Sequence, residues 1–289
     1  MAAAEGARCA VSILVTGGSG QLGSVLAGFD GVRAVSRGEL DITSVDAVDA
    51  AVSGASVVIN AAAYTAVDAA ETDADTAHAV NAVGPGVLAA ACLRHDVPLI
   101  HISTDYVFPG DGSRPYEVGD ETGPRSVYGR TKLAGELAVS QSGARTWVVR
   151  TSWVYGPVGG NFVRTMAALE STRDTLTVVD DQRGAPTYVP DLAAGLIELA
   201  SRTDSVPTGV LHATGAGETT WCGFAKAIFT ELGADPSRVQ PCTTADFPRP
   251  APRPAYSVLS NSAWIDAGLT PLRAWDSALT AAFAEHDWR

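Results

Sequence analysis

Two side chains suited to acid–base chemistry lie four residues apart, Tyr128 and Lys132. The residues that follow, 133–139, are typical of a helix, and positions i and i+4 lie on one face of a helix. A tyrosine phenol titrates near ~10, and a neighbouring ammonium group lowers that pKa by favouring the phenolate. The pair therefore predicts proton transfer to or from a carbonyl/alcohol pair. Because a tyrosine also precedes a lysine by four residues on many surface helices, the pair needs support from the rest of the chain.

A glycine-rich turn near the N-terminus could hold the cofactor for this chemistry. The strand-like run 11–15 leads into TGGSGQLG at 16–23, and a helix-like run follows. Glycines permit a tight turn and a close approach of the backbone to a pyrophosphate, and the start of the helix offers N–H donors. The pattern predicts a dinucleotide-binding site that includes Gly17, Gly20, Gln21 and Leu22.

The end of the second expected strand, 31–35, bears on the choice of dinucleotide. An acidic residue there binds the ribose 2′-hydroxyl of NAD, whereas an arginine accommodates the 2′-phosphate of NADP. This chain has Ser36 and Arg37, which favours NADPH and leaves NADH open. Asp41 and Ile42 follow, and we expect them along the adenine edge, although Asp41 could instead cap the next helix.

Three further strand-like runs, 55–59, 98–102 and 146–150, alternate with helix-like runs. This alternation predicts an α/β fold with a Rossmann-type, doubly wound parallel sheet. Ligands bind at the carboxyl ends of the strands in such sheets. Thr104 follows the fourth strand, where its hydroxyl could bond a substrate carbonyl and the tyrosine together. The other residues expected at these strand ends are Ala61, Ala62, Ala63, Tyr64 and Ile102.

The alternation of strands and helices weakens after residue 155, which predicts a second, smaller unit. We expect a dinucleotide-binding domain over 11–155 plus about 187–214, and an interleaved C-terminal substrate-binding lobe over 156–186 plus 215–289. Residues 1–10 are expected to be a loose tail. In the helix after the third strand, the run 84–86 (Gly-Pro-Gly) predicts a kink or break. Asn81 in that helix either joins a polar relay near the site or makes a structural hydrogen bond.

Bulk composition restricts the partners of the chain. Its net charge of −12 over 289 residues argues against nucleic acid or an anionic membrane as the main partner. Four scattered cysteines without a C-x-x-C motif indicate reduced thiols in a cytoplasmic protein. The N-terminus lacks the features of a secretory signal, and no apolar run looks long enough to span a bilayer. The acidic residues form no convincing metal-binding pattern, so we expect catalysis without a metal.

Taken together, the motifs resemble the extended short-chain dehydrogenase/reductase superfamily. Within it, the chain is most similar to the family of dTDP-4-dehydrorhamnose reductases. The resemblance covers nearly all of the chain after residue 10, with one departure in a loop, where Phe108-Pro-Gly replaces the frequent Phe-Asp-Gly. Its most specific stretches are GQLG at 20–23, AAAYTAVD at 61–68, STDYVF at 103–108, VYGRTKLAGE at 127–136, RTSWVYG at 150–156, NFV at 161–163 and DQRGAPT at 181–187.

This resemblance implies reduction by NADPH of the C4 ketone of dTDP-4-dehydro-L-rhamnose, the last step of dTDP-L-rhamnose synthesis. It implies that Tyr128 donates the proton, that Lys132 lowers the pKa of the tyrosine and holds the nicotinamide ribose, and that Thr104 orients the ketone. Trp153 would close over the sugar or nicotinamide unless it belongs to the core, and the same alternative applies to Phe108 and Val67. The positions matching the sugar-nucleotide site are Thr65, Val67, Thr104, Asp105, Phe108, Tyr128, Trp153, Asn161 and Gln182.

Other functions on the same scaffold stay open. One is a different nucleotide-sugar reductase, epimerase or dehydratase; a dehydratase would be expected to carry a carboxylate pair beside Thr104, whereas Asp105 is followed by Tyr106. Another is a non-catalytic, NADP-binding regulatory subunit, which the intact Thr104, Tyr128 and Lys132 disfavour. A homodimer is compatible with the sequence.

Overall fold

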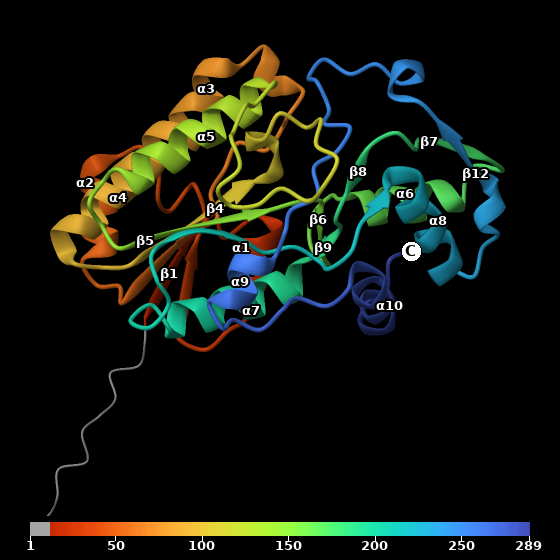
Figure 1. Ribbon diagram of the computed structural model, residues 1–289. Coiled ribbons are helices and arrows are strands. Elements are labelled where there is room, and N and C mark those ends of the chain that lie inside the picture. Colours follow the sequence, from red (N-terminus) through yellow and green to blue (C-terminus); the bar gives the residue numbers. More distant parts are fainter. Residues whose placement is uncertain (1–11) are drawn as a thin grey trace, which may run out of the picture.

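The computed structural model describes residues 12–289, so the tail expected over 1–10 lies outside the described residues. Within these residues a six-stranded, all-parallel sheet forms the centre of the molecule, with strand order β10-β5-β4-β3-β1-β2 (Figure 1). This confirms the predicted Rossmann-type sheet. Its strands are β1 (Ile13–Thr16), β2 (Val32–Val35), β3 (Val57–Asn60), β4 (Leu99–Thr104), β5 (Thr146–Thr151) and β10 (Gly209–His212).

Helices cover both faces of this sheet because successive strand residues point to opposite sides. Val15 packs in a cluster with Leu26, Leu196 and Trp264, whereas its neighbour Leu14 packs in another cluster on the opposite side. The first cluster joins the sheet to α1 (Gln21–Leu26), α7 (Val189–Ser201) and α9 (Ser262–Asp266); the second joins it to α2 (Val45–Val52), α4 (Gly84–His95) and α5 (Val127–Ser140).

The helix after β3 does not break at 84–86, where a kink or break was expected. It runs without interruption from α3 (Ala74–His78) through a π-helical turn, η2 (Ala79–Val83), into α4, and Pro85 lies in the first turn of α4. Proline is tolerated there because the N–H it lacks need not be bonded within the helix. This 22-residue helix is long and apolar enough to cross a membrane, but half of its most apolar window is buried inside the fold, as in a core helix.

A second hydrophobic core lies beside the sheet, at the right of Figure 1. Tyr155, Tyr188, Phe224 and Phe229 are buried in it. Its helices are α6 (Phe162–Glu170), α8 (Trp221–Glu231) and α10 (Trp275–Glu285), and its short strand pairs are β6 (Val154–Tyr155) with β9 (Thr187–Tyr188), β7 (Leu176–Val179) with β12 (Val239–Cys242), and β8 (Arg183–Gly184) with β11 (Thr219–Thr220). Single 3-10 turns are η1 (Ala69–Glu71), η3 (Asp105–Val107), η4 (Pro236–Arg238) and η5 (Thr244–Asp246).

Candidate active site

A cleft of about 700 Å³ lies at the carboxyl ends of β1, β3 and β4 and extends to the second core. Most residues predicted for the site line this cleft, whereas Ser36, Phe108, Asn161 and Gln182 do not line it. The predicted residues on its wall are Gly17, Gly20, Gln21, Leu22, Arg37, Asp41, Ile42, Ala61, Ala62, Ala63, Tyr64, Thr65, Val67, Ile102, Thr104, Asp105, Tyr128, Lys132 and Trp153.

The glycine turn leaves bare backbone on the cleft wall. Gly17 has φ +76°, and a Cβ atom built on it would lie 2.6 Å from the amide nitrogen of Ala62. A Cβ atom on Gly23 would lie 2.2 Å from the carbonyl oxygen of Gly17. Both contacts are too short for any residue with a side chain. The turn therefore fits a dinucleotide whose pyrophosphate approaches the backbone closely.

The loop after β2 contains an acidic residue, Glu39, that was not predicted to lie near this end of the strand. Glu39 accepts hydrogen bonds from both the backbone N–H and the hydroxyl of Ser36, each at 2.7 Å. Ser36 therefore faces Glu39 and not the cleft, whereas Arg37 lines the cleft. Asp41 accepts from the amide and the hydroxyl of Thr43, at 2.9 and 2.7 Å, so it shapes the loop and does not cap α2.

Thr104, the last residue of β4, bonds to its neighbour in the chain. Its hydroxyl donates to Asp105 Oδ1 at 2.9 Å and accepts from the backbone N–H of Tyr106 at 3.2 Å. The second carboxylate oxygen of Asp105, Oδ2, has no hydrogen-bond partner among residues 12–289 and is buried. Burial raises the pKa of Asp105 to about 6, although hydrogen bonds from Ser257 and Thr104 act in the opposite direction. Asp105 thus holds the Thr104 hydroxyl beside the cleft.

The N-terminus of α5 brings Tyr128 close to Thr104. Ser126 caps the helix by accepting from the backbone N–H of Gly129 at 3.1 Å. A Cβ atom on Gly129 would lie 2.3 Å from the carbonyl oxygen of Tyr106, so glycine lets α5 approach the end of β4 closely. The ring of Tyr106 packs edge-on against Tyr128, with centroids 5.6 Å apart.

The pKa of Tyr128 is raised in the fold, whereas the sequence predicted that Lys132 would lower it. Burial raises the pKa of Tyr128 to about 12, the hydrogen bond with Thr104 lowers it, and the Asp105 carboxylate raises it. Lys132 Nζ donates instead to the carbonyl oxygen of Ile102 at 2.6 Å. Tyr128 therefore carries its proton at neutral pH, as a proton donor must. Burial also lowers the pKa of Lys132 to about 8, while the charge of Glu136 raises it.

Two stacked tryptophans form the wall of the cleft next to the second core. Trp153 and Trp221 have ring centroids 3.6 Å apart and an interplanar angle of 10°. Trp153 has φ 45°, an unusual value for a residue with a side chain. A Cβ atom on Gly184 would lie 2.4 Å from the Trp153 ring, so glycine is needed there. Trp221 was missed from the sequence because it begins α8, about 70 residues away from the other site residues.

The three remaining predicted residues make structural contacts. Asn161 caps α6 by accepting from Arg164 N at 3.1 Å, and its amide also donates to Gln21 Oε1 at 3.2 Å, which links the second core to the glycine turn. Phe108 is buried and stacks on Tyr116, with centroids 4.3 Å apart. Gln182 donates to Thr244 Oγ1 at 2.9 Å. Asn81 also bonds structurally, to both backbone groups of Tyr64 and to the hydroxyl of Thr131.

A glycine-lined cleft at the strand ends of a parallel sheet, with a threonine, a tyrosine and a lysine in it, defines a dinucleotide-dependent enzyme of the short-chain dehydrogenase/reductase type. Among residues 12–289 no three side chains of His, Cys, Asp or Glu lie together in a way that could hold a metal ion.

Comparisons with known proteins agree with this class. Residues 11–287 match the family model described as RmlD substrate binding domain, and the chain belongs to this family. It is 50% identical over 279 residues to the dTDP-4-dehydrorhamnose reductase of Mycolicibacterium smegmatis, covering 94% of this chain and 85% of that protein. The crystal structure of a dTDP-4-dehydrorhamnose reductase from Clostridium acetobutylicum has a TM-score of 0.90 at 41% identity, with 94% and 98% of the two chains covered. The corresponding enzyme of Bacillus anthracis, solved in complex with NADP, has a TM-score of 0.89 at 35% identity, with 95% and 99% covered.

Proposed function

We propose that this protein is an NADPH-dependent oxidoreductase that reduces the C4 ketone of dTDP-4-dehydro-L-rhamnose to give dTDP-L-rhamnose. The observation that carries the proposal is the meeting of Thr104, Tyr128 and Lys132 in one cleft beside the glycine turn, in a chain 50% identical to dTDP-4-dehydrorhamnose reductases. When bound, NADPH supplies the hydride.

The residues of the chain divide the remaining work. Tyr128, protonated at neutral pH, donates a proton to the oxygen that was the ketone. Thr104 orients that oxygen by donating to it the hydroxyl proton that Asp105 Oδ1 accepts in the structure. Lys132 holds the nicotinamide ribose with its ammonium group, which also stabilises the phenolate that remains on Tyr128. Donors fixed before the reaction stabilise charge where it develops without needing to reorganise.

The nucleotide sugar occupies the part of the cleft next to the second core. Thr65 and Val67 form one side, after β3, and Trp153 with Trp221 forms the other. The stacked indoles offer a flat apolar surface to the sugar ring and help to exclude water. Asn161 acts indirectly, because its bond to Gln21 fixes the second core against the glycine turn.

The state of the cysteines supports a reducing, cytoplasmic compartment as the site of action. Cys92, Cys222 and Cys242, which lie in the described part of the chain, are free thiols.

The test is oxidation of NADPH, followed by its absorbance, in the presence of enzymatically prepared dTDP-4-dehydro-L-rhamnose. Tyr128→Phe should lower kcat by ~10²–10⁴-fold, the usual contribution of a positioned proton donor, with NADPH binding retained. Tyr256→Phe is a matched control, because that hydroxyl bonds Glu218 outside the cleft. If the wild-type protein binds both ligands but does not turn over, the assignment is wrong. If Tyr128→Phe keeps full activity, only the proton-donor role is wrong.

A further inference from the structure

Behind Lys132, one turn further along α5, a second ionised side chain is buried. Glu136 is 3% exposed and Lys132 2% exposed. Arg150 of β5 donates to Glu136 through Nε at 2.9 Å to Oε1 and through Nη2 at 2.7 Å to Oε2. The hydroxyl of Ser103, on β4, also donates to Oε1. Such a fork of donors fixes a carboxylate in both position and orientation.

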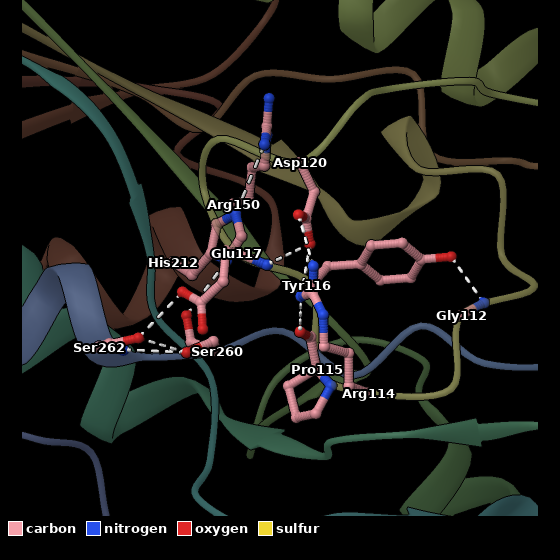
Figure 2. Close-up of polar contacts among 10 residues, drawn as sticks. All are labelled: Gly112, Arg114, Pro115, Tyr116, Glu117, Asp120, Arg150, His212, Ser260 and Ser262. Atoms are coloured by element: carbon pink, nitrogen blue, oxygen red, sulfur yellow. Dashed lines mark hydrogen bonds and ion pairs between the residues drawn. The ribbon is translucent and has the colours of Figure 1, made fainter.

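The sheet holds Arg150 in place. Ser103, Arg150 and His212 are direct partners across β4, β5 and β10, so their side chains share one face. Arg150 Nη1 lies 3.4 Å from His212 Nε2, and His212 Nδ1 lies 3.2 Å from the carbonyl oxygen of Ser260. Figure 2 shows His212 between Arg150 and the segment that contains Ser260. The Arg150 guanidinium also lies 4.9 Å from the centre of the Phe108 ring. This packing gives Phe108 a role outside the cleft.

Several titratable and charged groups surround Lys132. Tyr128 and Glu136 lie one turn to either side of Lys132 on α5, His101 lies on β4, and Arg150 and His212 lie beyond Glu136. Burial lowers the pKa of His101 and lowers that of His212 to about 3, so both imidazoles are neutral. Lys132 and Arg150 are cations, and Glu136 is an anion that pairs with Arg150 at 2.7 Å and lies one helical turn from Lys132. Asp105, whose carboxylate raises the pKa of Tyr128, has a pKa of about 6 and is largely ionised at neutral pH, so with it the charges sum to zero while Tyr128 is protonated.

We propose that Glu136 is a positioning residue for Lys132: its carboxylate, fixed by Arg150 and Ser103, keeps the buried ammonium group charged in the cleft. Without this anion, burial favours the neutral amine, which binds the nicotinamide ribose less well and cannot balance a phenolate on Tyr128. This inference assumes that Lys132 has the role that the proposed function gives it.

The sequence makes the charge of Lys132 directly measurable, since the chain contains two lysines, Lys132 and Lys226. In protein labelled with ¹³C-lysine, two side-chain signals can be followed against pH. Lys226 lies partly exposed on α8 and serves as the internal reference. Lys132 should titrate near the pKa of about 8 given by burial and Glu136. In Glu136→Gln its pKa should fall by at least ~1, the usual effect of losing a close opposite charge.

Two further variants separate this effect from a structural one. Glu136→Gln leaves Arg150 buried without its partner and could unfold the protein. In Glu136→Leu/Arg150→Met both charges of the pair are replaced by apolar groups of similar size, which the fold tolerates better, and the pKa of Lys132 should still fall. Ser103→Ala keeps both charges and removes one donor to the carboxylate, so the pKa of Lys132 should fall less than in Glu136→Gln. An unchanged pKa of Lys132 in a folded variant lacking Glu136 overturns the proposal.

Kinetics then distinguish this inference from the proposed function. In the variants without Glu136, the decrease of kcat/KM at alkaline pH should move to lower pH together with the NMR titration of Lys132. If the wild type does not reduce the nucleotide sugar but the titration moves as expected, the proposed function fails and the pairing stands. If turnover is normal and the titration does not move, the pairing fails and the proposed function stands.

Discussion

Replacing Asp105 by asparagine should stabilise the folded protein at neutral and alkaline pH. The carboxyl group is buried, and Oδ2 has no partner among residues 12–289. Burial raises its pKa above the ordinary value, so the fold favours the neutral form. The wild type is therefore most stable below the pKa of Asp105 in the unfolded chain. It loses stability as the pH rises toward and through the pKa of Asp105 in the folded protein. An asparagine is neutral at every pH and avoids that loss.

The magnitude follows from the two pKa values. With a pKa of about 6 in the fold and 3.8 in the unfolded chain, linkage predicts that the wild type loses about 1.6 kcal/mol at pH 5 and about 3 kcal/mol at pH 8. The amide accepts the bond from Thr104 more weakly than a carboxylate does, which offsets about 1 kcal/mol of the gain. Asp105→Asn should thus be more stable by about 2 kcal/mol at pH 8. The advantage should shrink by about 1.4 kcal/mol between pH 8 and pH 5.

Urea denaturation at pH 5, 6.5 and 8 measures this difference, with equal m values as the check on comparable unfolding. Asp204→Asn is the matched control: its side chain is 95% exposed and paired with Arg145 on the surface, where ion pairs contribute little, so its effect should not vary with pH. The reasoning is refuted if the Asp105→Asn advantage does not grow from pH 5 to pH 8. It is equally refuted if the variant is the less stable protein at pH 8.

Three further substitutions test the cofactor end, the aromatic wall and the helix crossing. Arg37→Ala should reduce the ratio of kcat/KM for NADPH to kcat/KM for NADH by ~10–100-fold, the range expected for a lost hydrogen bond to a charged group. If this ratio does not change, Arg37 does not bind the 2′-phosphate. Gly184→Ala should displace Trp153 and lower kcat/KM for the nucleotide sugar by ~10²-fold, with a change in tryptophan fluorescence; normal kinetics would show that the wall can adjust. Gly135→Ala should lower the free energy of unfolding, measured in urea, by ~1–3 kcal/mol, because the new Cβ would lie 2.0 Å from the carbonyl oxygen of Asn81. Alanine normally stabilises a helix interior relative to glycine, so a more stable variant would contradict this close contact.

The sheet could be predicted from the sequence because its signals are local. Each strand is a short apolar run followed by a helix-like run, and β10 lies within the range of about 187–214 over which the chain was expected to return to this domain. The carboxyl ends of parallel strands meet at one edge, so Thr104 could be assigned to the cleft before its neighbours were known. Of the kink or break expected at 84–86, the break was wrong, because a π-helical turn at 79–83 leads directly into α4, whose first turn contains the glycines and proline.

The residues that could not be predicted interact with partners distant in sequence. Trp221 reaches the cleft by stacking on Trp153, a contact that no local pattern signals. Glu136 was part of a quoted motif, but its significance depends on Arg150, which comes from a different strand. The pKa of Tyr128 was misjudged for a related reason. Spacing reveals which charges are near a group, whereas burial depends on the whole fold.

Burial moves three groups of the cleft toward their neutral forms: it raises the pKa of Tyr128 and Asp105 and lowers that of Lys132. A site that disfavours charge is well suited to donate a proton, because Tyr128 does not ionise until the sugar oxygen accepts its proton. The phenolate that then remains is stabilised by the ammonium group of Lys132. The cleft thus keeps Tyr128 protonated until the transfer, and Glu136, by keeping Lys132 charged, preserves the cation that stabilises the phenolate afterwards.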